Sequence, residues 1–246
     1  MIKGHILKFL GLAVVALLCC SKEGLSQKKE ATLHITFENM ANDKLLLLND
    51  SSYVNHFAEQ YSINKLKYYI SDISLGTKDK SLASENIFLI DAADEEDIRI
   101  NILPGIYSTI NFTLGIDSAY NTSGAQEGAL DPLNGMFWTW NTGYVYFKLE
   151  GYSNASTADL HRIEHHIGGY EGPNKANRQI ELNLKEPLVI KEGDQKNMVI
   201  NLNLDKYWNG QNPVSILANA LIMTTGELAK KSADNFPGMF FIKSVN

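Results

Sequence analysis

Two short segments of the sequence gather the side chains best suited to chemistry. Residues 161–169 hold three of the six histidines, among them His165 and His166. Trp138 and Trp140, two of the three tryptophans, follow a loop rich in Gly, Asn, Ser and Asp. Imidazole is the commonest metal ligand in proteins and suits copper, zinc, iron or nickel. The histidine segment is therefore a candidate metal-binding segment.

The adjacent histidines also have an ordinary structural interpretation. Successive side chains of a strand point to opposite faces, so one ion can hardly take both His165 and His166. A surface histidine or a hydrogen-bonded core histidine is the default state for either residue. We expect isoleucines on the face of His165 and charged residues on the face of His166: Ile163 and Ile167 on the first, Arg162 and Glu164 on the second.

The tryptophan pair follows a loop of about twenty residues, and loops of that length inside a compact domain are uncommon and often functional. The alternative is that Trp138 and Trp140, two residues apart, share one strand face and pack in the core. Oxygen-bearing side chains of the loop could bind Ca²⁺, but their spacing is not that of an EF-hand, and Asx turns explain them more simply. These side chains are Asp117, Asn121, Asp131 and Asn134.

The elements that must position these residues are strands. From Ala31 onward apolar and polar residues alternate with period two, which is typical of half-buried strands. Strands are expected at 31–37, 66–75, 87–90, 99–103, 110–116, 144–149, 180–184, 188–190 and 198–204, and helical pattern at 215–223 and 227–233. Short strands without regular helices between them favour an all-β fold, an antiparallel β-sandwich or open barrel with one or two short C-terminal helices. The expected core includes Leu33, Ile35, Ile70, Phe112, Leu114, Phe147, Ile200 and Leu202.

The N-terminus indicates export. Residues 1–19 have the proportions of a signal peptide, and their apolar run is too short to span a bilayer. The order Leu-Leu-Cys-Cys at 17–20 resembles a bacterial lipobox, with Cys20 as the acylated residue. We expect residues 20–30 to form a flexible tether and residues 31–246 a single β domain, lipid-anchored to the outer membrane and facing the periplasm or the exterior. A plain signal peptide cleaved a few residues later is the alternative.

Composition and missing motifs exclude several function classes. The formal net charge is −6 and no Lys/Arg-rich run is present, so nucleic acid is not an expected partner. The only cysteines are Cys19 and Cys20, so no disulfide is expected within the domain. The sequence has no Gly-x-Ser-x-Gly elbow, phosphate loop, His-Glu-x-x-His or Rossmann fingerprint. We therefore do not expect an enzyme.

Six motifs, in order, resemble the MbnP family of methanobactin-associated copper-binding proteins and their Bacteroidetes homologues. They are Leu-Lys-Tyr-Tyr-Ile-Ser-Asp-Ile (66–73), Pro-Gly-Ile-Tyr (104–107), Leu-Gly-Ile-Asp (114–117), Gly-Ala-Leu-Asp-Pro (128–132), Met-Phe-Trp-Thr-Trp (136–140) and His-Ile-Gly-Gly (166–169). The resemblance implies an exported β-rich protein that binds copper through histidines and a kynurenine made by oxidising a tryptophan. It also implies a partner oxidant, a dihaem enzyme related to MauG and bacterial cytochrome c peroxidase.

The resemblance carries the metal role to particular residues. Trp138 and Trp140 match the family's Trp-x-Trp run, with Trp138 nearer the polar loop, and His166 matches its His-(aliphatic)-Gly-Gly segment. For a second imidazole we name His34, on the polar face of the first strand. Two features depart from the family: no Cys follows the glycines, and no Met cluster suggests Cu(I).

The sequence thus predicts an exported copper-binding or copper-delivery lipoprotein. The alternative is a non-catalytic surface module that recognises an organic ligand or a protein partner without metal. The geometry discriminates between them. An imidazole pair close to one tryptophan ring favours the metal, and tryptophans sealed far from every imidazole favour the alternative.

Overall fold

The computed structural model describes residues 30–246 except 51–52, 77–80, 95–96, 125 and 139–142. Cys20, the predicted signal peptide, nearly all of the predicted tether and Trp140 lie outside the described residues.

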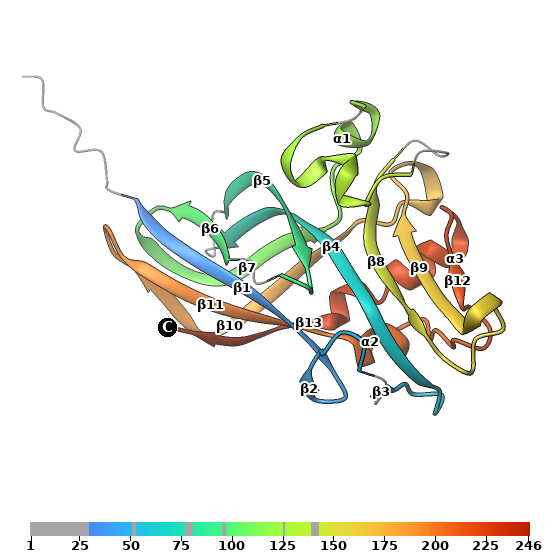
Figure 1. Ribbon diagram of the computed structural model, residues 1–246. Helices are drawn as coiled ribbons and strands as arrows, with labels where there is room; N and C mark the ends of the chain where they lie inside the picture. The colour runs from blue at the N-terminus through green and yellow to red at the C-terminus, as the bar shows by residue number, and fades with distance from the viewer. Residues whose placement is uncertain (1–29, 51–52, 77–80, 95–96, 125, 139–142) are drawn as a thin grey trace, which may run out of the picture.

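Two β-sheets pack face to face, which confirms the expected all-β sandwich (Figure 1). The five-stranded sheet contains β1 (Ala31–Ala41), β2 (Lys44–Leu45), β6 (Asp97–Ile102), β11 (Gln195–Asn203) and β13 (Phe240–Val245). The eight-stranded sheet contains β3 (Tyr53–Val54), β4 (Gln60–Gly76), β5 (Ser81–Asp91), β7 (Gly105–Leu114), β8 (Val145–Tyr152), β9 (Arg162–Gly168), β10 (Arg178–Ile190) and β12 (Leu221–Ile222).

The core follows from the alternation of the strands. All eight side chains expected in the core are at most 2% exposed. Phe112 on β7 joins the two sheets, because its ring packs edge-on against Phe37 of β1 at 5.7 Å and Phe240 of β13 at 5.2 Å between centroids. Burial of such large apolar surfaces is the main stabilising term of a sandwich of this kind.

The sheets are not purely antiparallel, unlike the expectation. β1 runs parallel to β11 over nine residue pairs, and β12 runs parallel to β9. The long strand β4 pairs with β8 through its first half and with β5 and β7 through its second half. This arrangement brings β4, β8 and β9 side by side, which is the part of the sheet that holds the candidate histidine.

Helices are short. They are α1 (Ser118–Thr122), α2 (Leu204–Trp208) and α3 (Glu227–Ala233), with 3-10 turns η1 (Gly128–Leu130), η2 (Pro132–Asn134), η3 (Asp159–His161), η4 (Gly172–Asn174) and η5 (Phe236–Met239). The helix expected at 227–233 is confirmed as α3. No helix among the described residues is long and apolar enough to cross a membrane.

The helix expected at 215–223 is wrong. This segment is a turn followed by β12. The carboxylate of Glu59 accepts hydrogen bonds from the backbone N–H groups of Ile216 (2.7 Å) and Leu217 (2.9 Å) and from the Ser215 hydroxyl (2.8 Å). Glu59 therefore caps one turn, in which the Asn219 N–H donates to the Ser215 carbonyl at 2.9 Å. The helix does not continue, because Leu221 and Ile222 pair with β9 instead.

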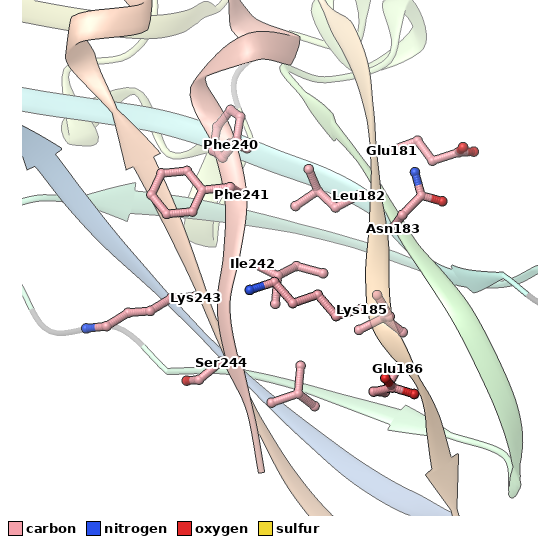
Figure 2. Close-up of a pocket in the computed structure, with 12 residues that line it drawn as sticks. Glu181, Leu182, Asn183, Lys185, Glu186, Phe240, Phe241, Ile242, Lys243 and Ser244 are labelled. Carbon is pink, nitrogen blue, oxygen red and sulfur yellow. The ribbon is translucent and has the colours of Figure 1, made fainter.

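On one side of the sandwich, β10 is the edge strand of the eight-stranded sheet and β13 is the edge strand of the five-stranded sheet. Among the described residues β10 pairs only with β7, and β13 only with β11. A groove of about 460 Å³ lies between these edges, and Leu182 and Ile242 point into it (Figure 2).

Candidate functional site

The strand β9 separates its two adjacent histidines as expected. His165 lies fully buried on the inner face with Ile163 and Ile167. His166 lies on the outer face with Arg162 and Glu164, and 11% of its side chain is exposed. The two imidazoles therefore cannot share an ion.

His166 is held by a carboxylate of the neighbouring strand. Its Nε2 lies 2.9 Å from Glu150 Oε1 on β8. A carboxylate at this distance accepts, so Nε2 carries the proton, and in the neutral imidazole the lone pair is on Nδ1. Metal-binding histidines are typically oriented by donating the other ring N–H to a carboxylate. His166 thus has the orientation that a ligand needs, with Nδ1 as the atom that would bind.

Lysines complete the network around Glu150. Lys65 Nζ of β4 lies 2.8 Å from Oε2, and Lys148 Nζ lies 3.4 Å from Oε1 and donates to the carbonyl of Gly135 at 2.6 Å. The His166 hydrogen bond, with help from Lys65, holds the pKa of Glu150 far below its ordinary value. Burial lowers the pKa of Lys148, against the attraction of Glu150. The carboxylate is therefore ionised and fully engaged at neutral pH.

Trp138 lies on the same side of the sheet as His166. A Cβ on Gly168, two residues along β9, would come within 2.8 Å of the Trp138 ring and 2.5 Å of the Tyr144 carbonyl oxygen. Only glycine leaves room for the indole here. Trp138 is 5% exposed, so the ring is nearly sealed but lies against the strand that carries His166.

The long loop is fixed to the sheet by buried polar groups, which positions Trp138. Tyr144 donates its hydroxyl to the Leu130 carbonyl at 2.8 Å, and Tyr69 donates to the Ala129 carbonyl at 3.0 Å. Asn121 accepts from the Tyr144 N–H and donates to the Tyr146 hydroxyl. The Trp138 N–H then donates a hydrogen bond to the Gly143 carbonyl at 3.1 Å.

The acidic side chains of the loop accept hydrogen bonds from nearby backbone N–H groups. The side chain of Asp117 accepts from the Ala119 N–H and that of Asp131 from the Leu133 N–H, both at 2.8 Å. These contacts are the Asx turns that the sequence favoured over a Ca²⁺ site.

His165 is a core histidine. Its Nε2–H donates to the Asn219 carbonyl at 2.7 Å, so Nδ1 accepts from the Tyr207 hydroxyl at 2.8 Å. Burial lowers its pKa to about 4, so the ring is neutral. Both nitrogens are occupied, and His165 has no ring atom to offer a metal.

His34 does not meet His166. It lies on β1 in the five-stranded sheet, where the inward residues are Leu33 and Ile35, and its Nδ1 is 2.8 Å from Asp97. His34 and His166 thus point outward from different sheets of the sandwich. Among the described residues, no three His, Cys, Asp or Glu side chains converge as a metal site. Trp140 lies outside these residues.

Comparison with known proteins identifies the family. The sequence model of the MbnP family matches residues 30–224. The chain belongs to the MbnP family. A solved structure, MbnP from Methylosinus trichosporium, is similar with a TM-score of 0.50 and 13% sequence identity, covering 89% of this chain and 99% of that one. At this identity the likeness concerns the fold. No curated protein matches.

The His-Ile-Gly-Gly motif of this MbnP-family chain can now be explained physically. His166 faces outward and Ile167 fills the core, while Gly168 makes room for Trp138. Gly169 has φ +139, and a Cβ there would lie 2.7 Å from the Asn174 carbonyl oxygen. Glu150 was missed in the sequence because it follows the expected strand 144–149, and β8 extends beyond that expected end to Tyr152.

Proposed function

We propose that this protein is an exported, lipid-anchored copper-binding or copper-delivery protein whose copper site is completed by oxidation of a tryptophan. The observation that carries the proposal is the packing of Trp138 on Gly168, two residues from His166 on the same face of β9. The hydrogen bond from His166 Nε2 to Glu150 supports it, because Nδ1 has no partner among the described residues.

The encoded donors alone fall short of a copper site. His166 supplies one imidazole, and the nearest carboxylate, Glu150, is already engaged by Lys65. An indole N–H is a donor and cannot coordinate a cation. Unmodified protein should therefore hold copper weakly.

Oxidation would change the donor set at Trp138. Conversion to kynurenine cleaves the double bond of the indole's five-membered ring and removes one ring carbon as formate. The product has an aryl amine and a ketone, both with lone pairs. The oxidising equivalents would come from peroxide through a dihaem partner related to MauG and cytochrome c peroxidase. Trp140 is the second candidate, and His34, which lies in the other sheet, is no longer proposed as a partner of His166.

The test combines mass spectrometry with copper titration. Protein produced with the dihaem partner should show, in the peptide 136–144, the loss of one carbon and the gain of one oxygen, and should bind copper much more tightly than protein produced without it. Copper should also bind more tightly than zinc, because divalent affinities peak at copper. An unaltered peptide mass after co-expression would contradict the proposal.

Anchoring is tested separately. We expect Cys20→Ala to move the protein from the membrane fraction to the soluble fraction, because two acyl chains at ~0.8 kcal/mol per buried CH₂ hold a protein far more firmly than its surface does. Ser21→Ala, next in the chain, is the matched control and should stay with the membrane. Equal fractionation of wild type and Cys20→Ala would indicate a plain, cleaved signal peptide.

The alternative function is a binding module for an organic ligand or protein partner that uses no metal and no catalysis. The groove between β10 and β13 favours it, because its volume of about 460 Å³ is that of a small-ligand site, and apolar side chains alternate with polar and charged ones along its walls (Figure 2). It contains none of the residues proposed for copper. Lack of copper binding by oxidised protein would leave this alternative as the better account.

A further inference from the structure

One end of the sandwich is the place where the described chain begins. Ala31 at the start of β1 pairs with Ile102 at the end of β6, and the Thr32 N–H donates to the Asp194 carbonyl at 2.9 Å. In Figure 1 the start of β1, the β6–β7 turn and the β10–β11 turn lie together, and β9 lies at the far side of the molecule. Residues 20–30 therefore join the domain at this end.

Apolar side chains are exposed at the same end. Ile106 of β7 and Val189 of β10 face each other directly across the ladder and are 62% and 49% exposed. Leu103, in the β6–β7 turn, is 40% exposed. We call these three residues the end patch. Their neighbours Tyr107 and Leu188 point into the core, so the outward apolar positions are not needed for packing.

We propose that the end patch lies on the lipid surface to which the chain is tethered. This inference rests on the proposed acylation of Cys20. A flexible segment of the length of residues 20–30 spans about 20 Å on average, so this end stays close to the bilayer. Because the chain is tethered, the effective concentration of lipid at the end patch is high. Even a weak apolar interaction then keeps the patch bound to lipid for much of the time.

The charges beside the end patch permit this contact. The β10–β11 turn and the start of β11 carry two lysines and two acidic residues: Lys191, Glu192, Asp194 and Lys196. The four charges sum to zero, whereas the whole chain has a net charge of −6. This end therefore repels an anionic lipid surface less strongly than the rest of the molecule does. With the end patch on lipid, β9 would lie on the side of the molecule far from the membrane (Figure 1).

The test places a spin label at the end patch of the acylated, full-length mature chain. Ile106→Cys is labelled with a nitroxide, and Leu133→Cys, at a 93% exposed apolar residue of η2, is the matched control. Both proteins are bound to vesicles of phosphatidylcholine and phosphatidylglycerol. Oxygen, which concentrates in lipid, and a water-soluble nickel chelate then compete to relax the label. We expect a several-fold higher oxygen-to-nickel ratio at residue 106 than at residue 133.

The outcomes separate this inference from the anchor. Equal ratios on vesicle-bound protein would overturn the lipid contact and leave the anchor intact. Dipolar broadening between labels at residue 106, without lipid contact, would also overturn it and show that a second copy covers the end patch. Failure of the acylated chain to float with vesicles would overturn both the anchor and the contact.

Discussion

Adjacent histidines of β9 have different environments because a strand alternates its faces. His165 is neutral in the core between Tyr207 and Asn219, and His166 meets an ionised carboxylate on the outer face. Burial disfavours the charged form of the first, while Glu150 orients the second. The two rings differ in chemistry although their sequence positions differ by one.

The core histidine predicts an acid-side loss of stability. The pKa of His165 is about 4 in the folded protein against 6.5 for an ordinary histidine, so between these pH values the unfolded chain binds a proton that the folded chain does not. The free energy of unfolding should fall by roughly 3 kcal/mol between pH 7 and pH 4 from this group alone, at 1.36 kcal/mol per pKa unit. Well above pH 6.5 the imidazole is neutral in both states, so the free energy of unfolding no longer changes with pH because of this group.

His165→Gln tests this assignment, because glutamine can hydrogen-bond but does not titrate. Urea unfolding at a series of pH values should show a flatter decline for the variant than for wild type between pH 6.5 and 4.5. Parallel curves for the two proteins would contradict a buried neutral His165.

At the scale of elements, the outer face of β8 and β9 depends on one glycine. The Trp138 ring packs against Gly168, and the Tyr144 carbonyl also lies close to this glycine. Any side chain there must displace one or the other. The segment that carries the tryptophan is thereby coupled to the strand that carries His166.

Gly168→Ala should therefore destabilise the protein by about 1–3 kcal/mol, as overpacking in tight sites does. It should also change the tryptophan emission as Trp138 moves. Gly238→Ala is the matched control, since a Cβ there meets nothing within 4 Å, and should change stability by less than about 0.5 kcal/mol. Equal unfolding midpoints and spectra for both variants would be incompatible with the described packing.

The alternation of residues allowed eight of the thirteen described strands, the eight core side chains and the two faces of the His165–His166 segment to be predicted, but not β9 or β13 as strands. It could not reveal the Glu150 network, because the register between strands does not follow from alternation. Lys65 of β4 pairs with Glu150 of β8, a strand far along the chain, and Lys148 pairs with His166 across the next hairpin. Alternation also could not show that the strand of His34, β1, belongs to the five-stranded sheet, whereas His166 lies in the eight-stranded sheet. The helix expected at 215–223 failed for a similar reason, since its last residues pair with β9, a strand more than fifty residues earlier in the chain.

At the scale of the whole molecule, the two sheets are joined by aromatic side chains. Phe112 of the eight-stranded sheet packs between Phe37 and Phe240 of the five-stranded sheet. The helices α2 and η5 cover the inner face of β8, where Phe147 lies 5.1 Å from Tyr207 and 5.2 Å from Phe236 between ring centroids. Both parts belong to one continuous core.

Phe112→Ala should cost about 3–5 kcal/mol, which is a large part of the stability of an ordinary domain. Phe241→Ala, at a ring that is 44% exposed on the edge strand β13, is the control and should cost far less. Thermal or urea unfolding followed by far-ultraviolet circular dichroism measures both. A small effect at Phe112 would contradict its place between the sheets.

Copper binding by this protein should depend on oxidation of Trp138, which packs on Gly168 two residues from His166. The most direct measurement is copper titration calorimetry of oxidised protein, verified by the mass of peptide 136–144, for wild type, His166→Ala and His56→Ala, the last at an exposed histidine far along the chain from the site. We predict tight binding of one copper ion by wild type and His56→Ala, and a loss of at least about tenfold in affinity, or about 1.4 kcal/mol, for His166→Ala. Equal affinity of all three proteins, or of oxidised and unoxidised wild type, would contradict the claim.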